Sequence, residues 1–234
     1  MTKFLITGAS SGIGRAVARK LAARGATLLL NSRAAEQLAP VAADCIAAGG
    51  VGVVHAGDLT TPGVAESLFK AAQDQLGGLD AVIHCAGVGL IKPTVETSDE
   101  DFSRVMNINA RATFLVAREA CRFFAAQNRG LFITLPGVAG RAGVRNSSAY
   151  AASKFAVSGM LKSMALEFQR NNVRFCQLHL GGVDTPFWDG LQMNVQRDRL
   201  IPVDVAANTI LAAIDLPSHL VLNEIVLQSE NHQL

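Results

Sequence analysis

The sequence predicts a three-layer, doubly wound α/β fold in which helices cover both faces of a mostly parallel, seven-stranded sheet. Short apolar runs alternate with helical patterns along all 234 residues, which is typical of βαβ units with right-handed crossovers. The apolar runs show no polar face, as expected for strands buried on both sides. No repeat, low-complexity stretch or Gly/Ser/Pro-rich linker interrupts this pattern, so we predict one domain spanning residues 1–234.

The elements follow from apolar periodicity and from the turn residues that bound it. The predicted strands span residues 3–7, 27–32, 52–56, 81–85, 131–135, 174–180 and 220–227. Predicted helices span 12–23, ending near Gly25, and 34–48, ending at Gly49, because glycine commonly follows a helix C-terminus. A third opens at Thr61-Pro62, where proline is tolerated in a first turn. The longest predicted helices span 98–127 and 148–170.

The composition excludes several classes of protein. A net charge of +2 gives no case for a nucleic-acid surface, which needs clustered Lys and Arg. No apolar run approaches the length that spans a bilayer, and no secretory leader precedes the first strand. The four cysteines form no CxxC pair and no metal-ligand spacing, which is typical of reduced, buried thiols. We expect a cytoplasmic protein that binds no metal, nucleic acid or membrane.

A glycine-rich loop lies between the first predicted strand and the first predicted helix. It reads Thr7-Gly8-Ala9-Ser10-Ser11-Gly12-Ile13-Gly14. Gly8 suits a tight turn, Gly12 lets the backbone approach a pyrophosphate, and Gly14 lets the helix pack close to the strand. The helix N-terminus offers free N–H groups to phosphates. The alternative, an ordinary glycine-rich turn, is disfavoured by the strand before the loop and the helix after it.

The end of the second strand indicates which dinucleotide is bound. A site that prefers NAD usually carries a carboxylate there for the ribose hydroxyls, but this strand ends Leu30-Asn31-Ser32-Arg33. Arg33 can pair with a 2′-phosphate through its fork of donors, and Arg15 lies just past the glycine loop. We therefore predict NADP(H) rather than NAD(H); the alternative is that Arg33 is a solvated loop charge.

Tyr150 and Lys154 are four residues apart in a predicted helix, so both lie on one face. A nearby ammonium lowers the pKa of a phenol, and such a phenol can exchange a proton with an alcohol or carbonyl oxygen. The same lysine can bond a ribose. The pair alone is common by chance, but together with the glycine loop it predicts a nucleotide-dependent acid/base site.

These motifs resemble those of the short-chain dehydrogenase/reductase family over the whole chain. The T-G-x-x-x-G-I-G loop and the Y-x-x-x-K pair both match. Further matches are Asp58-Leu59 after the third strand, Ala86-Gly87, Asn109, and the segment with Gly181, Val183, Thr185 and Pro186. The resemblance implies a Rossmann-like fold and an oxidoreductase acting on CH–OH groups.

The resemblance also assigns residues to roles. The implied catalytic residues are Tyr150, Lys154 and Asn109. The implied cofactor contacts are Gly8, Ser10, Ser11, Gly12, Ile13, Gly14, Arg33, Asp58, Leu59, Ala86, Gly87, Lys154, Gly181, Val183 and Thr185, with Asp58 near adenine and Thr185 on the nicotinamide amide. Family members form dimers and tetramers through the two long helices. A homodimer or homotetramer is therefore expected.

Three positions depart from the family pattern. The N-N-A-G motif reads His84-Cys85-Ala86-Gly87, and the P-G motif reads Leu180-Gly181. His84 invites an acid/base role, but a histidine at the end of a core strand is more often structural. The third departure is Gly137, thirteen residues before Tyr150, where the family has its catalytic serine. Losing one donor that polarises the substrate oxygen typically costs about 10²–10³ in rate.

Two hypotheses follow from Gly137. In the first, the protein is an oxidoreductase in which Tyr150 transfers the proton and Lys154 tunes it, while Asn109 organises a proton path. Oxygen binding then passes to Thr134, Ser147 or Ser148; the simpler role of both serines is to cap the Tyr150 helix. In the second, the chain binds NADP(H) without catalysis, as a sensor or oligomer partner. A reaction that needs no polarised ketone is a third possibility.

The segment after Thr185 is expected to cover the substrate. Its apolar residues are Phe187, Trp188, Leu191, Met193 and Val195. They indicate a small or medium, apolar carbonyl compound or alcohol, bound outside the carboxyl ends of the strands. The alternative is that these residues pack on the core or on a neighbouring subunit.

Overall fold

Seven strands pair side by side in one sheet of order β3-β2-β1-β4-β5-β6-β7. The structure is a computed structural model that describes residues 2–191, 193 and 195–230. The strands are β1 (Lys3–Thr7), β2 (Thr27–Ser32), β3 (Val51–Ala56), β4 (Ala81–His84), β5 (Gly130–Thr134), β6 (Val173–Leu180) and β7 (Glu224–Leu227). Every pair is parallel, which confirms the predicted doubly wound, Rossmann-like α/β fold.

The strand order reverses between β1 and β4. The chain runs outward from β1 to β3 and then returns to place β4 on the other side of β1, with Thr7 opposite both Asn31 and His84. In open α/β sheets a crevice forms at the carboxyl ends of the strands where the order reverses. The reversal therefore determines where a ligand can bind.

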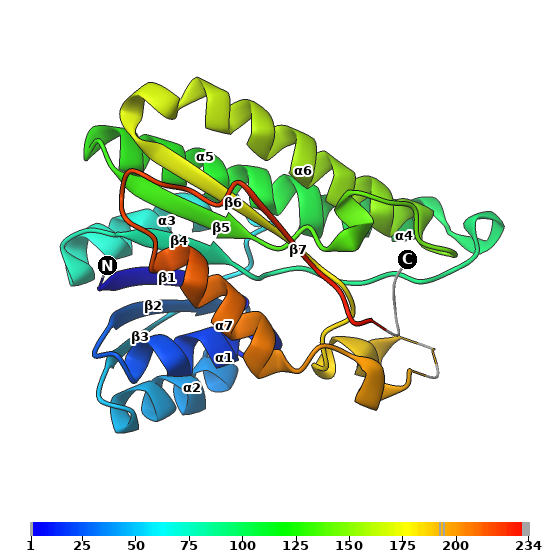
Figure 1. The fold of residues 1–234 in the computed structure, drawn as a ribbon, viewed down its shortest axis with the longest axis horizontal. Helices are drawn as coiled ribbons and strands as arrows, with labels where there is room; N and C mark the ends of the chain where they lie inside the picture. Colours follow the sequence, from blue (N-terminus) through cyan, green and yellow to red (C-terminus); the bar gives the residue numbers. More distant parts are fainter. Residues whose placement is uncertain (1, 192, 194, 231–234) are drawn as a thin grey trace.

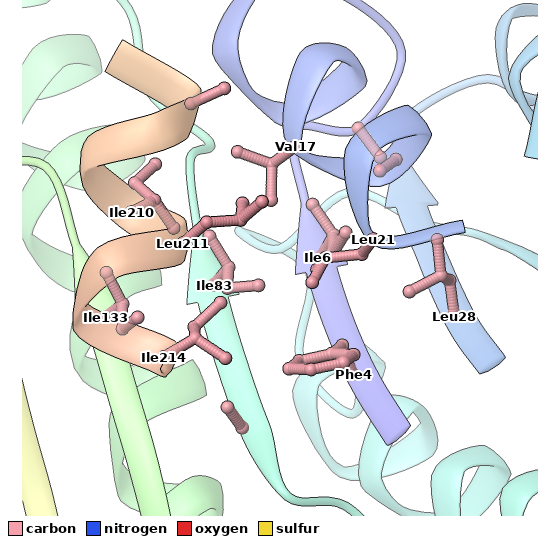
Figure 2. Packing of buried hydrophobic residues seen from close by; sticks show 14 of the residues in the cluster. Phe4, Ile6, Val17, Leu21, Leu28, Ile83, Ile133, Ile210, Leu211 and Ile214 are labelled. Atoms are coloured by element: carbon pink, nitrogen blue, oxygen red, sulfur yellow. The ribbon is translucent and has the colours of Figure 1, made fainter. Parts of the chain in front are cut away.

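Helices cover both faces of the sheet (Figure 1). On one face lie α1 (Gly12–Ala22), α2 (Ala35–Ala47) and α7 (Val203–Ile214); on the other lie α3 (Val64–Ala71), α5 (Ala112–Ala126) and α6 (Ser148–Glu167), with α4 (Asp99–Val105) beside α6. Figure 2 shows how α1 and α7 place Val17, Leu21 and Leu211 over Ile6 and Ile83 of the sheet.

Alternate residues of a strand supply the two cores. In β5, Phe132 packs toward α5 and α6, while its neighbour Ile133 packs toward α7. This is the two-residue period of a strand, and it is why the central strands show no polar face. For the edge strand β3, the expectation that strands are buried on both sides is wrong, because Val51 and Val54 are 48% and 38% exposed.

Several predicted boundaries shift for local reasons. The helix expected to open at Thr61-Pro62 begins at Val64, after Gly63 in the left-handed region at φ 85°. The strand expected from residue 220 begins at Glu224, because Leu220 N donates to Pro217 O across a turn. The helix expected over 148–170 ends at Glu167 and continues as a 3₁₀ turn. The prediction lacks α7 altogether; its apolar segment follows Pro202 and carries no side-chain N-cap.

The helix expected over 98–127 is not a uniform α-helix. Between α4 and α5, residues Met106–Arg111 form a π-helical turn. Apolar periodicity cannot reveal such a turn, since the hydrogen-bond register changes while the chain stays helical. Short π segments inside helices are frequent at functional sites, and this one carries Asn109.

Candidate active site

A cleft of about 860 Å³ opens at the carboxyl ends of the strands, beside the point where their order reverses. Its volume lies within the ~300–1,000 Å³ typical of ligand sites. Predicted site residues that line it are Gly8, Ser10, Ser11, Gly12, Ile13, Gly14, Arg33, Asp58, Leu59, Ala86, Gly87, Tyr150, Lys154, Gly181, Val183 and Thr185. Asn109 is buried and lies behind the cleft wall.

The glycine loop is shaped by close backbone contacts. Gly8 and Gly12 have φ of 65° and 51°, in the left-handed region that favours glycine. A Cβ on Gly14 would lie 2.3 Å from Gly8 O, so only glycine lets α1 approach β1 this closely. Ser11 at the N-cap of α1 makes no side-chain cap. The first N–H groups of α1 therefore have no side-chain partner at the cap and suit a phosphate.

The end of the cleft beside β2 and β3 carries one positive and one negative residue. Arg33 and Asp58 both line it, and Asp58 Oδ1 accepts hydrogen bonds from Thr60 N and Thr60 Oγ1 at 2.8 and 2.7 Å. These bonds are the main reason that the pKa of Asp58 is lowered, and the Arg33 charge adds to the effect. Arg15, by contrast, pairs with Asp44 at 2.9 Å outside the cleft, so it gives no support for a phosphate site.

Buried Asn31 is a residue whose role the sequence did not reveal. Its Nδ2 donates to His55 O at 3.0 Å and to Gly57 O at 3.2 Å. It thereby joins the ends of β2 and β3, from which Arg33 and Asp58 extend into the cleft.

Tyr150 and Lys154 lie together on α6, as predicted. Lys154 Nζ donates to Leu135 O at 3.0 Å and lies 5.6 Å from the centre of the Tyr150 ring. Burial lowers the pKa of Lys154 to about 8. Burial also raises the pKa of Tyr150 to about 12, so the expectation that the lysine lowers it is wrong for the protein alone: loss of solvation outweighs the nearby charge. At neutral pH Tyr150 is a proton donor.

Asn109 does not line the cleft but joins two of the segments around it by hydrogen bonds. Its Oδ1 accepts from Val88 N at 2.8 Å, and its Nδ2 donates to Val88 O at 2.9 Å and to Ser153 Oγ at 3.0 Å. Ser153 Oγ then donates to Tyr150 O at 2.6 Å. The π turn thus holds both the chain leaving β4 and the first turns of α6.

His84 connects the glycine loop to the same π turn by directed hydrogen bonds. Thr113 Oγ1 donates to Asn109 O at 2.5 Å, so its oxygen accepts from His84 Nε2 at 2.9 Å. His84 therefore carries its proton on Nε2, and its Nδ1 accepts from Thr7 Oγ1 at 2.8 Å. Thr7 Oγ1 in turn accepts from Ala86 N at 3.4 Å. Each donor in this series of hydrogen bonds has one acceptor.

Burial, with a smaller contribution from the Lys154 charge, lowers the pKa of His84 to about 3. The ring is fully enclosed, with 2% of its surface exposed, and both nitrogens are occupied by threonine hydroxyls. The structural interpretation of His84 therefore fits its geometry better than an acid/base role.

Gly137 does more than omit a serine hydroxyl. It lines the cleft and has φ 69° and ψ 177°, a conformation that is essentially restricted to glycine. Its N donates to Leu178 O at 3.2 Å, and its O accepts from His179 Nδ1 at 2.9 Å. A Cβ there would meet only Leu180 O, at 3.4 Å, so the restriction comes from the backbone rather than from crowding.

None of the three hydroxyls considered as substitutes for the serine lines the cleft. Thr134 Oγ1 donates to His84 O, and Ser147 Oγ donates to Val144 O at 2.6 Å. Ser148 Oγ accepts from Thr94 Oγ1 at 3.1 Å. Ser147 stands at the N-cap of α6 but makes no side-chain cap. The expectation that one of them replaces the serine is therefore wrong.

The segment after Thr185 forms an aromatic roof. The Phe187 ring lies 6.3 Å from the Tyr150 ring and 5.4 Å from the Trp188 ring, and Trp188 Nε1 donates to Val183 O at 2.8 Å. Met193 and Val195 also line the cleft, whereas Leu191 does not. Lining residues that the sequence did not reveal include Ile91, Val138, Val144, Arg145, Gln196 and Arg199. They lie on loops and short 3₁₀ turns, where no periodicity signals a site.

Two searches of the described part of the chain found nothing. No helix there is both long and apolar enough to cross a membrane. No three or more His, Cys, Asp or Glu side chains lie together in an arrangement able to hold a metal ion.

Comparisons with known proteins agree with this architecture. A family model described as "short chain dehydrogenase" matches residues 2–196. A sepiapterin reductase of Chlorobaculum tepidum is 31% identical, covering 96% of this chain and 94% of its own. A hydroxynaphthalene reductase-like protein of Metarhizium anisopliae is 36% identical, covering 79% and 69%. An alcohol dehydrogenase of Thermococcus sibiricus, solved with 5-hydroxy-NADP, superposes with a TM-score of 0.92 at 25% identity, covering 100% and 99%.

Replacing His84 by asparagine, the residue of the N-N-A-G motif, will weaken the acid sensitivity of the fold. An unfolded histidine takes up a proton near pH 6.5, but His84 in the folded protein does so only near pH 3. The natural chain therefore loses stability as the pH falls from 6.5 toward 3, by up to about 1.4 kcal/mol per pH unit from this group. Urea unfolding at pH 7, 6 and 5 measures the difference.

His219→Asn is the matched control, because His219 is exposed and lies in the loop after α7. The free energy of unfolding of this variant should change with pH as it does in the natural chain. If the free energy of unfolding falls by the same amount in His84→Asn and in the natural chain between pH 7 and 5, this account of His84 is wrong.

Gly137→Ala and Gly137→Ser will both destabilise the fold by about 1–3 kcal/mol, the usual cost of placing a side chain in a glycine-restricted conformation. Equilibrium unfolding measures the loss. Gly143→Ala is the control, since Gly143 has an ordinary φ and a Cβ there meets nothing within 4 Å. If the Gly137 variants are as stable as the natural chain, the backbone at this position does not require glycine.

Proposed function

The chain belongs to the short-chain dehydrogenase family, and on that premise we propose that it is an NADP(H)-dependent oxidoreductase that interconverts a small or medium carbonyl compound and its alcohol. One observation carries the proposal: Tyr150 and Lys154 face the same cleft as the glycine loop. A proton donor and a dinucleotide site share one cavity, as reduction of a carbonyl requires.

Two observations support NADP(H). Arg33 stands where a 2′-phosphate of the adenosine ribose would lie, and the nearby Asp58 is held by Thr60. The solved structures similar to this chain include the Thermococcus sibiricus enzyme with 5-hydroxy-NADP and a metagenomic short-chain oxidoreductase with NADP, the latter with a TM-score of 0.84. The glycine loop offers backbone N–H groups to the pyrophosphate, and Thr185 packs against this loop, since a Cβ added at Gly12 would lie 3.3 Å from the Thr185 side chain.

When bound, NADPH supplies the hydride that reduces the carbonyl carbon. The Tyr150 hydroxyl donates its proton to the carbonyl oxygen as negative charge develops there. Lys154, whose pKa lies near 8, is mostly cationic at neutral pH and stabilises the phenolate that remains. Solvent then returns the proton to Tyr150. Asn109 holds the backbone of Tyr150 in place through Ser153.

The substrate half of the cleft is mainly apolar around Tyr150. Val88, Ile91, Val144, Phe187 and Trp188 line it. This lining suits an apolar carbonyl compound, and the aromatic roof excludes water from the reacting atoms.

Gly137 favours a second candidate function, an NADP(H)-binding protein without catalysis. No serine hydroxyl stands at this position, and Thr134, Ser147 and Ser148 are all engaged away from the cleft. Tyr150 is then left to polarise the substrate oxygen alone, which corresponds to a rate lower by about 10²–10³ than with the serine. A sensor or an oligomer partner needs no such donor.

The homo-oligomer expected from the sequence also remains a proposal. Exposed apolar residues gather on α4, α5 and α6: Phe102, Phe114, Phe155 and Leu166 are 46%, 41%, 45% and 77% exposed. Apolar surface of this kind commonly marks a contact between proteins.

Oxidation of NADPH against a panel of aldehydes, ketones and diketones tests the enzymatic proposal. The natural chain should turn over slowly with one or more of them, and Tyr150→Phe should abolish turnover while NADPH still binds, because only the proton donor is lost. Activity that persists in Tyr150→Phe would exclude Tyr150 as the acid. If the natural chain is silent and Gly137→Ser is more active than Gly137→Ala, the non-catalytic function is supported.

Arg33→Ala should weaken NADPH binding by about 10-fold or more, the usual value of a hydrogen-bonded charge pair, and should leave NADH binding unchanged. Fluorescence titration with both nucleotides measures this. Arg15→Ala is the control, because Arg15 pairs with Asp44 outside the cleft. Tighter binding of NADH than NADPH by the natural chain would overturn the choice of cofactor.

Light scattering at micromolar concentration should give a mass of at least two chains. Phe155→Glu should lower that mass, since a charge cannot be buried unpaired in an apolar contact. Ile46→Glu, on the exposed side of α2, should not. A monomeric natural chain contradicts the oligomer.

A further inference from the structure

The charges that line the cleft are unevenly distributed. Among its described lining residues the only carboxylate is Asp58, at the adenine end. Four cationic residues line the same cleft: Arg33, Lys154, Arg145 and Arg199. The first two have partners in the proposed function, namely the 2′-phosphate and the Tyr150 phenolate with the ribose. Arg145 and Arg199 have none.

Arg145 is carried by a loop that is fixed on both sides of it. Ser147 Oγ donates to Val144 O at 2.6 Å, and Lys92 N donates to Asn146 O at 2.5 Å. Arg145 therefore extends from a defined backbone, five residues before Tyr150 and next to Val144, which lines the cleft as well. In the described part of the chain no carboxylate lies within ion-pair distance of it.

The neighbouring arginine of this loop behaves differently. Arg141 lies 3.8 Å from Glu224, which also pairs with Lys162 at 2.6 Å. Arg141 does not line the cleft. The loop thus directs one positive charge to the edge strand β7 and the other to the cleft.

The turn that carries Arg199 likewise has one arginine that is paired with carboxylates and one that lines the cleft. Arg197 pairs with Asp184 at 2.8 Å and with Asp189, and it donates to Thr185 O at 3.2 Å. Arg199, two residues later, lines the cleft and has no ion pair with a described residue. Figure 1 shows this orange segment beyond the carboxyl ends of the strands.

We propose that the substrate is a carbonyl compound that carries a carboxylate, and that Arg145 and Arg199, which both line the cleft, bind this group. This inference rests on the proposed function and names the substrate class of the same site. A guanidinium offers two parallel donors that match a carboxylate. No described carboxylate that lines the cleft competes for them, because the only one, Asp58, is bonded to Thr60. The carbonyl end then lies among the apolar residues around Tyr150.

Phosphates of the cofactor are the other anions that arginines in this cleft can bind. Arg145 is assigned to the substrate because it belongs to the loop before α6, alongside Val138 and Val144, whereas the predicted phosphate contacts lie on the glycine loop and at Arg33. The experiment therefore measures nucleotide binding and acid binding separately.

The probes are benzoylformate and para-acetylbenzoate, each compared with its methyl ester, which keeps the ketone and removes the charge. Binding is measured on the NADP⁺-loaded protein by fluorescence of Trp188, the only tryptophan in the chain and a lining residue of the cleft. This readout needs no turnover. It therefore remains informative if the protein proves to be non-catalytic.

At least one acid should bind about 10-fold or more tightly than its ester. Arg145→Gln should remove that preference, Arg199→Gln should reduce it, and neither change should weaken NADP⁺ binding more than about threefold. Arg141→Gln is the matched control and should keep the natural preference. Where turnover is measurable, Arg145→Gln should raise KM for the acid more than KM for the ester.

Three results would overturn the proposal. The first is that each ester binds as tightly as its acid, or that neither acid binds at millimolar concentration. The second is an unchanged preference in Arg145→Gln. The third is a loss of NADP⁺ affinity in Arg145→Gln as large as the loss of acid affinity, which would assign the arginine to a cofactor phosphate.

Discussion

The pairing of β1 with β4 is the constraint on which the rest of the structure depends. Because the two strands are parallel neighbours that lead into crossovers on opposite sides, their carboxyl ends leave a crevice that no connection fills. The glycine loop leaves β1 into this crevice, and Ala86-Gly87 leaves β4 into it. The contact is close: a Cβ on Gly8 would lie 2.8 Å from Ala86 N. The glycine loop and the segment after β4 thus share one backbone contact.

His84 and Asn109 extend that constraint to the catalytic helix. A hydrogen-bonded chain runs from Ala86 N through Thr7, His84 and Thr113 to Asn109 O. Ala86 at one end lines the cleft and Asn109 at the other end lies behind its wall, while the histidine between them is neutral because burial opposes its charge. The π turn suits this arrangement, since it alters the helix register where Asn109 must reach both Val88 and Ser153.

The position of the family serine shows how a single residue affects both geometry and chemistry. Gly137 takes a backbone conformation that residues with side chains avoid, and His179 holds its carbonyl oxygen. The backbone conformation of the loop therefore disfavours a serine at this position. The cleft retains Tyr150 and the neighbouring Lys154, but at this position it has no serine hydroxyl. Recognition of the substrate by charge, at Arg145 and Arg199, would offset part of that loss through binding and orientation.

The sequence by itself determined the alternation of strands and helices, the glycine loop, and the pairing of Tyr150 with Lys154. Each of these is local, because a period of two or 3.6 residues and a spacing of four residues are properties of a short segment. The sequence did not determine the element boundaries that are set by a turn such as Pro217–Leu220 or by a left-handed glycine such as Gly63.

Only the tertiary structure decided which side chains share the site. Thr7 and His84 are 77 residues apart in sequence yet bonded at 2.8 Å, and Thr134, Ser147 and Ser148 bond to neighbours instead of lining the cleft. The raised pKa of Tyr150 likewise follows from burial that no local pattern encodes. Arg141 and Arg197 have ion pairs, whereas Arg145 and Arg199 have none with a described residue, and this difference is visible only in the folded chain. Hydrogen bonding, burial and ion pairing join residues that are distant along the chain, so the folded backbone must first bring them together.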